Sequence, residues 1–414
     1  MKITKLYKKK KVALLSILFF ILLFLKRRDQ LIHPDIWNED GTINLVSYLD
    51  SGWFNLFEPV QGYYITISKI ITNISMSISP LYYPEISTYI TWVFIIVVSL
   101  IVVYAPTILE HKILSAIIIY FIPAYAEVYG LPLYTFWFAG IFILLVALWQ
   151  EQKNQLLKNI LLIIGGLSSP IIVTLIPVQI YRLIILKNKR EELITLIISI
   201  ILSFIQLNIM LNQHAIDTNT HFTIEIIKNL YFNGYIAFYF GKYYLGALLM
   251  SDYSNWIAKD FTLLLYGGVA LLIFLLVALV VSYKDKWIYI FYYLLFAMLA
   301  STLYRTHFEI TYTSPRYFFY IYIVLSWLII YISNKNRYFE YISITIIILS
   351  MITSMQIFCK ESEYLNWRQH LHNCANSKNS YSIPIHFAGS RHGAWHITLN
   401  PKQCKELIEN RVYK

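Results

Sequence analysis

The chain has 414 residues, of which 58% are hydrophobic and 14% are charged, whereas soluble domains contain about 25% charged residues. Its formal net charge is +11. This composition excludes a soluble globular protein. Because the basic residues flank apolar segments, they indicate membrane topology and contact with anionic lipid, not nucleic-acid binding.

The first apolar run, residues 12–25, lies between lysine- and arginine-rich segments. No small-x-small cleavage site follows it, so we expect a retained first helix whose flanking lysines snorkel to the membrane surface. Further along, stretches of about 18–22 residues are almost free of charge, enough for a helix to cross the hydrocarbon layer. They are residues 86–105, 193–211, 261–282, 317–333 and 341–358.

Charge predicts the orientation of these spans. With the amino terminus in the cytoplasm, the whole excess of +11 falls in the segments assigned to that side, as the positive-inside rule requires. Those segments are 1–11, 110–112, 150–158, 182–192, 283–286 and 334–340. Residues 159–184 fit this scheme only as a broken hairpin that turns at residues 165–170, where Gly165, Gly166 and Pro170 interrupt the helix.

The predicted fold class is therefore all-α, a polytopic transmembrane bundle of about 11 membrane segments within residues 1–358. A first outer loop over 26–85 carries two juxtamembrane helices, and a second large outer loop covers 212–260. A small external domain follows at 359–414.

This external tail contains all three cysteines and five of the histidines. An oxidising exterior would allow one disulfide, and Cys374 with Cys404 is the most plausible pair. The spacing of the tail histidines and cysteines matches no zinc motif, so we expect an ordinary small domain and no metal ligands there.

An acidic cluster follows the first apolar run: Asp35, Glu39 and Asp40, beside Trp37 and Gly41. An acid at a helix start can simply cap the helix. Three acids together on an outer loop favour a functional site instead.

Glycosyl transfer at the outer membrane surface fits this cluster. Such a reaction uses a carboxylate as base for the acceptor hydroxyl and cationic groups for the departing phosphate. Aromatic side chains such as Trp37 and Tyr63 can stack on sugar rings. The tyrosine-rich segment at 231–244 adds further aromatic groups.

The run from Trp37 to Lys69 resembles a family of bacterial multi-pass membrane proteins, in which W-x-E-D-G is followed by G-x-x-x-L-F-x-P and G-Y-L motifs. This family is similar to the GT-C superfamily of membrane glycosyltransferases, which use lipid-phosphate sugars. The resemblance continues in the Leu167-Ser168-Ser169-Pro170 turn and in Arg316-Tyr317-Phe318. Lys69 departs from the family pattern, because an arginine preceded by proline is usual there.

The resemblance implies that Asp40 is the essential acid, with Glu39 as second choice. It also implies that His33 and Asp35 belong to the substrate-binding start of the loop, and that Lys69 holds the donor phosphate as a point charge.

Further cations are candidates for the same clamp. Arg305, His307 and Arg316, with the adjacent Tyr317, flank one short outer connection, and Lys242 lies in the second large loop. Each arginine could equally be a membrane-boundary anchor, but arginine is also a natural ligand of phosphate oxygens. The acids could also hold Mg or Mn, although no cofactor is firmly indicated.

The sequence thus predicts a glycosyltransferase of the cytoplasmic (inner) bacterial membrane, with its site facing outward. Its partners would be membrane lipids, a polyprenyl-phosphate sugar as donor and a glycan or lipid-linked acceptor. Three alternatives stay open: an O-antigen-type polysaccharide polymerase, a transporter or lipid flippase, and a non-catalytic membrane assembly factor. Neither the sugar nor the linkage follows from the sequence.

Overall fold

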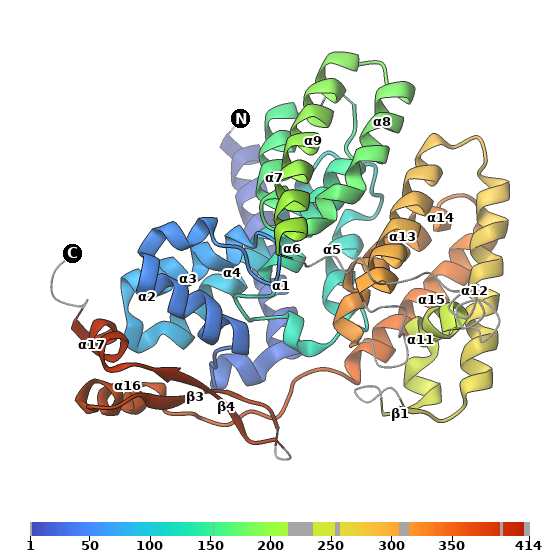
Figure 1. The fold of residues 1–414 in the computed structure, drawn as a ribbon. Helices are drawn as coiled ribbons and strands as arrows, with labels where there is room; N and C mark the ends of the chain where they lie inside the picture. Colours follow the sequence, from blue (N-terminus) through green and yellow to red (C-terminus); the bar gives the residue numbers. More distant parts are fainter. Residues whose placement is uncertain are drawn as a thin grey trace.

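The computed structural model describes residues 2–151, 153–213, 235–252, 257–305, 314–389 and 392–409, and the described part is mainly helical (Figure 1). The helices and helical turns are α1 (Lys2–Ile32), η1 (Asp40–Leu45), α2 (Val46–Ser51), η2 (Gly52–Phe57), α3 (Thr66–Ile78), η3 (Pro80–Tyr82), α4 (Tyr83–Tyr104), α5 (Lys112–Phe121), η4 (Ala126–Val128), α6 (Thr135–Ala147), α7 (Gln155–Gly166), η5 (Pro170–Thr174), α8 (Leu175–Ile185), α9 (Lys189–Asn212), α11 (Tyr235–Leu249), α12 (Phe261–Val281), α13 (Lys286–Arg305), η8 (Pro315–Phe318), α14 (Phe319–Ser333), α15 (Arg337–Met355), α16 (Trp367–Asn376) and α17 (Pro401–Glu409). Two antiparallel hairpins complete the fold, β1 (Met250–Asp252) with β2 (Ile257–Ala258), and β3 (Tyr381–Phe387) with β4 (Ala394–Leu399).

Six helices within the described residues are long and apolar enough to cross a membrane, which confirms the predicted helical architecture and supports a multi-pass membrane protein. They are Pro80–Tyr104, Lys189–Asn212, Phe261–Val281, Lys286–Tyr304, Pro315–Ser333 and Arg337–Met355. Shorter apolar helices accompany them, among them α5, α6 and α7. The total of about 11 segments and the GT-C architecture remain predictions.

The broken hairpin is present. Helix α7 ends at Gly166 and η5 begins at Pro170, so the chain turns back into α8 at the predicted place. The two open ends of the hairpin meet, because Lys158 of α7 and Arg182 of α8 both bind Glu192 at the start of α9, at 2.9 and 2.8 Å. The hairpin therefore enters and leaves at the same end of the bundle, as the charge pattern requires.

The first helix differs from expectation at its end. It continues to Ile32 and bends at Arg27 (φ −142°, ψ 45°). Lys26 is fully buried and donates to Ser354 Oγ at 2.9 Å, and Arg27 is paired with Asp29 at 3.0 Å. The prediction that this lysine snorkels to the surface is wrong, because the bundle supplies it with buried partners.

Residues 235–249 are also not an open loop. They form α11, which packs against α12 and α15, with Phe238, Tyr239 and Tyr243 buried. Glycines allow this close crossing: a Cβ at Gly268 would lie 1.5 Å from the carbonyl oxygen of Ala237. Of the predicted outer loop 212–260, this part lies within the helix bundle, and residues 214–234 and 253–256 lie outside the described residues.

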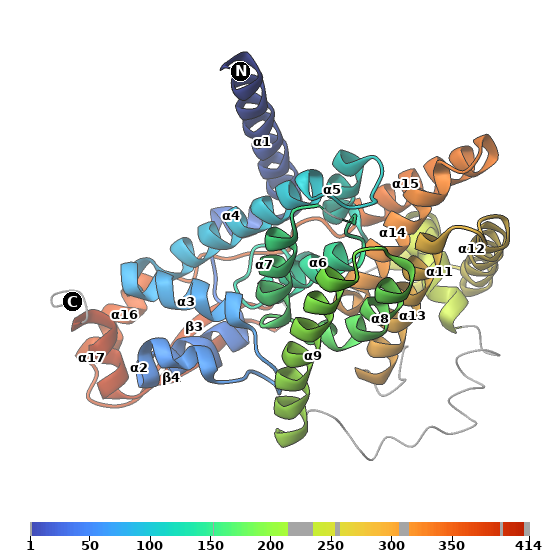
Figure 2. The ribbon, with the colours of Figure 1, turned by 90° about the horizontal axis from the view of Figure 1, so that it is seen from above.

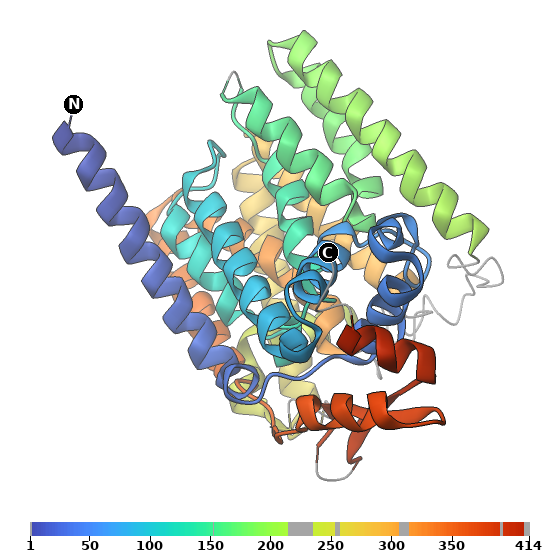
Figure 3. The same ribbon diagram turned by 90° about the vertical axis from the view of Figure 1, so that its left-hand side faces the viewer.

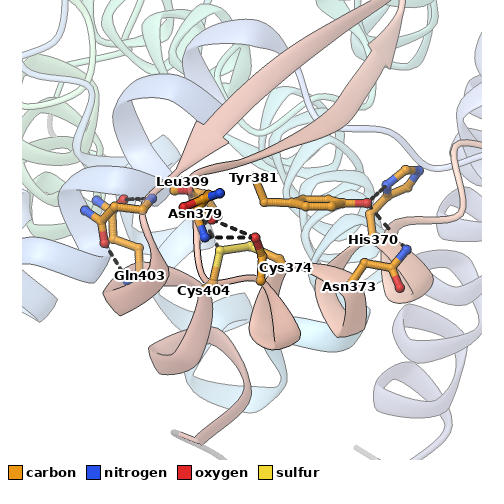
Figure 4. Close-up of a disulfide and its surroundings, with 10 residues drawn as sticks. His370, Asn373, Cys374, Asn379, Tyr381, Leu399, Gln403 and Cys404 are labelled. Atoms are coloured by element: carbon orange, nitrogen blue, oxygen red, sulfur yellow. Dashed lines mark hydrogen bonds between the residues drawn. A yellow bond between two sulfur atoms is a disulfide. The ribbon is translucent and has the colours of Figure 1, made fainter.

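The tail does not close a core of its own. Its buried side chains Trp367, Leu371, Ile385 and Leu407 form one apolar cluster with residues of the first loop and the start of α4, such as Ile36. The Ile36 N–H donates to the Ile385 carbonyl at 2.7 Å, and the tail thus covers the acidic loop. The predicted disulfide between Cys374 and Cys404 is present and joins α16 to α17 (Figure 4).

Figure 3 shows the molecule from the left-hand side of Figure 1. In this view the amino terminus lies at one end of the molecule, and the β3–β4 tail lies toward the other end. The view from above shows α2 and α3 beside the tail, away from the amino-terminal end of α1 (Figure 2). The acidic loop, which follows α1, is therefore at the end of the bundle that carries the tail.

Candidate functional site

The acidic loop ends in a π-helical turn, η1, which begins at Asp40. Such turns are rare and occur frequently at functional sites. Neither acid acts as a helix cap through its side chain: Glu39 at the cap position makes no capping hydrogen bond. Asp40 instead accepts hydrogen bonds from Asn44 Nδ2 at 3.1 Å and from the Leu133 backbone N–H at 3.0 Å.

Asp40 is fully buried, and this burial raises its pKa from 3.8 to about 7. The hydrogen bonds from Leu133 and Asn44 oppose the rise, and the nearby carboxylates of Glu39 and Asp35 add to it. A carboxyl group with a pKa near the working pH can take up and release a proton readily.

Glu39 faces a cavity of about 460 Å³ and accepts a hydrogen bond from Gln61 Nε2 at 2.9 Å. The cavity is bounded by the first loop, the segment before α6, the hairpin turn, and the ends of α9, α13 and α14. Its lining residues are Glu39, Val60, Gln61, Tyr63, Ile65, Leu133, Tyr134, Phe136, Trp137, Ser169, Pro170, Ile171, Val173, Thr174, Leu207, Met210, Met298, Ala300, Ser301, Thr302, Tyr304, Arg316, Tyr317 and Tyr320. Most of these side chains are apolar or aromatic, so the cavity suits an amphiphilic ligand.

Arg316 lines the same cavity as Glu39. Its Nη1 donates to Glu127 Oε1 at 2.7 Å and to Tyr134 Oη at 2.9 Å. Its guanidinium carbon lies 5.4 Å from the ring centroid of Tyr317, which also lines the cavity. A carboxylate from the first loop and a guanidinium from η8, the turn before α14, therefore share one pocket.

Aromatic rings form much of the wall between these charges. The ring centroids of Tyr63 and Phe136 are 5.8 Å apart, and those of Trp137 and Tyr320 are 4.9 Å apart. Rings packed in this way present fixed faces on which a sugar ring or an isoprenoid chain can lie.

Two predicted phosphate ligands lie elsewhere. Lys69 is buried and donates to the Asn55 carbonyl at 2.7 Å, so it holds η2 against α3 and does not line the cavity. Burial lowers the pKa of Lys69 to about 8, against the raising effect of Glu58. Lys242 is buried in α11, with its Nζ 5.9 Å from the Phe238 ring, and it also lies outside the cavity lining. The sequence spacing could not show that α3 and α11 turn these lysines toward other helices.

The predicted substrate residues at the start of the loop contact the tail. Asp35 Oδ2 lies 2.5 Å from His386 Nδ1, and the Trp37 ring packs against those of Trp395, His386 and Tyr134. The His33 ring lies 6.3 Å from the ring of Tyr364. These residues do not line the cavity and instead join the acidic loop to the tail.

Arg305 is the last residue of α13, but its side chain and the whole of His307 lie outside the described residues. Their predicted part in the phosphate clamp stays a prediction.

The acids offer an imperfect fit to Mg or Mn. Both carboxylate oxygens of Asp40 already accept N–H donors, and Glu39 is bonded to Gln61. Among the described residues no third acid, histidine or cysteine joins them in a ligand set, so we assign no step to a metal.

Sequence reasoning missed Glu127, Tyr134 and Gln61 as parts of the site. Glu127 was recognisable as a lone acid in the short connection between two apolar helices, a setting in which a charge needs a partner. Gln61 and Tyr134 carry no signal in the sequence, because their position depends on how the first loop folds over α6.

Comparison of this chain with profiles of known protein families, with curated proteins and with solved structures finds no match.

Proposed function

We propose that this protein is a membrane glycosyltransferase that moves a sugar from a polyprenyl-phosphate donor to a glycan or lipid-linked acceptor at the outer face of the cytoplasmic membrane. One observation carries the proposal: Glu39 and Arg316, distant in sequence, line one largely apolar, aromatic cavity. A base for the acceptor, a cation for the phosphate and an apolar surface for the lipid are the three groups that this reaction needs.

In the proposed reaction, the acceptor hydroxyl oxygen forms a bond to the anomeric carbon of the donor sugar. The bond from that carbon to the phosphate oxygen breaks, and the electron pair stays on the phosphate. Glu39 takes the hydroxyl proton, and the Arg316 guanidinium stabilises the negative charge on the leaving phosphate.

The geometry of the site exchanges the roles that the sequence predicts for Asp40 and Glu39. Glu39 lines the cavity, whereas Asp40 is buried behind it and binds the backbone of Leu133, a lining residue. We therefore assign the proton transfer to Glu39. Asp40 becomes a positioning residue, because it fixes η1 to Leu133, a residue of the cavity wall.

The apolar part of the cavity supports a lipid-linked donor. Leu207 and Met210 come from the end of α9, and Met298 comes from α13. Both helices are long enough to span a membrane, so a chain lying between them would remain beside the hydrocarbon layer.

The direct test is sugar transfer by the full-length protein in liposomes, with a panel of radiolabelled polyprenyl-phosphate sugars and a lipid-linked acceptor extract. We expect Glu39→Gln to lower the rate at least roughly 100-fold, because a general base contributes about 10²–10⁴-fold. Glu58→Gln is the matched control, since Glu58 is an acid of the same loop that binds Ser47 and Ser51 and does not line the cavity.

Wild-type activity in Glu39→Gln, or no transfer by the wild-type protein from any donor, would contradict the proposal. Polymerisation of intact repeat units would favour the polymerase, and movement of lipid-linked sugar without covalent change would favour the flippase. Loss of transfer in a chelator, restored by Mg or Mn, would add a metal to the site.

A further inference from the structure

Glu127 connects the cavity to the tail. It lies in η4, is 5% exposed, and places one carboxylate oxygen at 2.7 Å from Arg316 Nη1 and the other at 3.5 Å from Lys360 Nζ. These groups come from η4, from η8 and from the first residues of the tail. Three segments far apart in the sequence thus meet around one buried carboxylate, and we call Glu127, Arg316 and Lys360 the outer ion cluster.

The cluster fixes Arg316 by one edge of its guanidinium. Within the described residues, its hydrogen bonds all leave from Nη1, toward Glu127 and Tyr134. In this part of the chain, Nε and Nη2 make no hydrogen bond, and Arg316 lines the cavity. An arginine held by one edge can offer the other edge to a phosphate as a bidentate donor.

Charge balance explains what Lys360 adds. Arg316 and Glu127 alone form a neutral pair, which attracts an anion weakly. Lys360 restores a net charge of +1 to the cluster, although it does not line the cavity. Arg27 and Asp35 also act on Lys360 electrostatically; Arg27 is paired with Asp29 at 3.0 Å, and Asp35 lies 2.5 Å from His386.

The surroundings of Lys360 hold its ammonium group in place. Its Nζ lies 5.0 Å from the Tyr125 ring and 5.5 Å from the ring of Trp37, the residue that precedes the acidic turn. Lys360 therefore contacts the acidic loop and Glu127 at the same time, and the tail could not loosen without moving its charge.

We propose that Glu127 and Lys360 complete the anion site of the cavity: Glu127 positions the Arg316 guanidinium, and Lys360 offsets the charge of Glu127 so that a lipid phosphate is attracted. This inference rests on the proposed function only in its choice of a lipid phosphate as ligand. It assigns to the tail a part in donor binding.

The opposite end of the bundle provides a matched control. There Glu192 binds Arg182 at 2.8 Å and Lys158 at 2.9 Å, all three of them buried. This cluster has the same composition of one glutamate, one arginine and one lysine. Loss of its lysine should cost similar packing without affecting the cavity.

The experiment measures binding of tritiated farnesyl phosphate and of tritiated farnesol to the full-length protein in zwitterionic nanodiscs. We expect Lys360→Met to weaken farnesyl phosphate binding about tenfold, the effect of removing a unit charge roughly 10 Å away in a protein interior. Farnesol binding should not change. Lys360→Arg and Lys158→Met should bind both probes like the wild type.

Equal farnesyl phosphate affinity in Lys360→Met and wild type would overturn the inference, as would an equal loss in Lys158→Met. A parallel loss of farnesol binding would show general loosening of the tail and would also overturn it, as would a wild type that does not prefer the phosphate. If Lys360→Met does not fold, Lys360→Gln removes the same charge and keeps a hydrogen-bond donor toward Glu127.

Transfer kinetics separate this inference from the proposed function. If the wild type transfers sugar and Lys360→Met leaves both the donor KM and phosphate binding unchanged, the function stands and the inference fails. If phosphate binding depends on Lys360 but no transfer occurs, the inference stands and the function fails. With both correct, Lys360→Met raises the donor KM about tenfold and changes kcat little.

Discussion

Two acids in this protein hold cations from other elements. Glu127 pairs with Arg316, and Glu192 pairs with Arg182 and Lys158, whereas Arg27 pairs with Asp29 within α1. A buried charge without a partner is costly, so the pairs made by Glu127 and Glu192 fix the elements that they join. Asp40 is different, because its buried carboxyl group accepts two N–H donors and, among the residues that the structure describes, forms no ion pair.

This difference makes Asp40 a source of pH dependence in stability. Its pKa rises from 3.8 to about 7 on folding because of burial. Between these values the folded chain holds a proton that the unfolded chain has released, so stability falls as the pH rises through this window. We expect Asp40→Asn to remove this dependence and to gain about 3 kcal/mol relative to wild type from pH 5 to pH 8.

Thermal unfolding of the purified protein across this pH range is the measurement. Asp50→Asn is the control, since Asp50 is an exposed acid of the same loop. A constant difference in midpoint between Asp40→Asn and wild type at every pH would refute this prediction.

At the residue scale, the sequence could identify the acids of the site but not which of them faces the cavity. Three acids beside Trp37 indicated a site, and Glu39 and Arg316 do line one cavity. Which of two adjacent acids faces the cavity depends on the π-helical turn, and the sequence pattern does not show that turn. Lys69, taken from the family resemblance, and Lys242 were proposed beside Arg316 as phosphate ligands, but the sequence does not give the direction of a side chain.

At the element scale, the first loop and the tail act as one unit. The tail packs β3 over the acidic loop, and a Cβ on Gly41 would lie 2.8 Å from the Ile385 side chain. Next to the β3–β4 hairpin, the disulfide joins α16 to α17 (Figure 4). The Tyr381 hydroxyl at the start of β3 lies 3.1 Å from His370 Nδ1 of α16. Order in the acidic loop therefore depends on the disulfide-linked tail.

This dependence predicts the effect of removing the disulfide. A bond that closes a loop over a separation of 30 residues stabilises the linked unit by roughly 3–4 kcal/mol. We expect Cys374→Ser to speed amide hydrogen exchange in β3, β4 and at Ile36, whose N–H binds the tail. Exchange mass spectrometry measures this effect.

Cys359→Ser is the control, because Cys359 is the cysteine outside the disulfide. Equal exchange in both variants would show that the tail is ordered without its disulfide. Faster exchange in the tail with unchanged exchange at Ile36 would show that the order of the acidic loop does not depend on the tail.

The elements that the sequence predicts well are the apolar spans and the hairpin break. Five uncharged stretches became long helices, and Pro170 opens the second arm of the hairpin. Residues 235–249 were predicted to be a loop because their tyrosines and Lys242 lower the hydropathy of the segment. The glycine contacts between α11 and α12, and the tyrosine hydrogen bonds within the bundle, allow this polar segment to pack inside.

At the scale of the whole molecule, the two ion clusters occupy opposite ends of the bundle. The cluster of Lys158, Arg182 and Glu192 closes the open ends of the hairpin, whereas the hairpin turn itself, at Ser169 and Pro170, lines the cavity. Every segment that we assigned to the cytoplasm by charge should therefore lie away from the cavity. The proposed reaction requires this separation, because its lipid-linked donor would be used on the side of the membrane where nucleotide sugars are absent.

Thiol labelling in intact cells tests this orientation. In a Cys359→Ser background, Ser380→Cys in the exposed end of the tail should react with a membrane-impermeant maleimide, because we place the tail outside. Arg190→Cys, at an exposed position at the start of α9, should react only after the membrane is permeabilised. The reverse labelling pattern would show that the molecule has the opposite orientation, with the cavity on the cytoplasmic face. Labelling of both positions in intact cells would contradict their separation by a membrane. On the predicted topology the charge excess of +11 lies on the side of Arg190, so inversion would bring it to the outer face, against the bias that membrane insertion imposes.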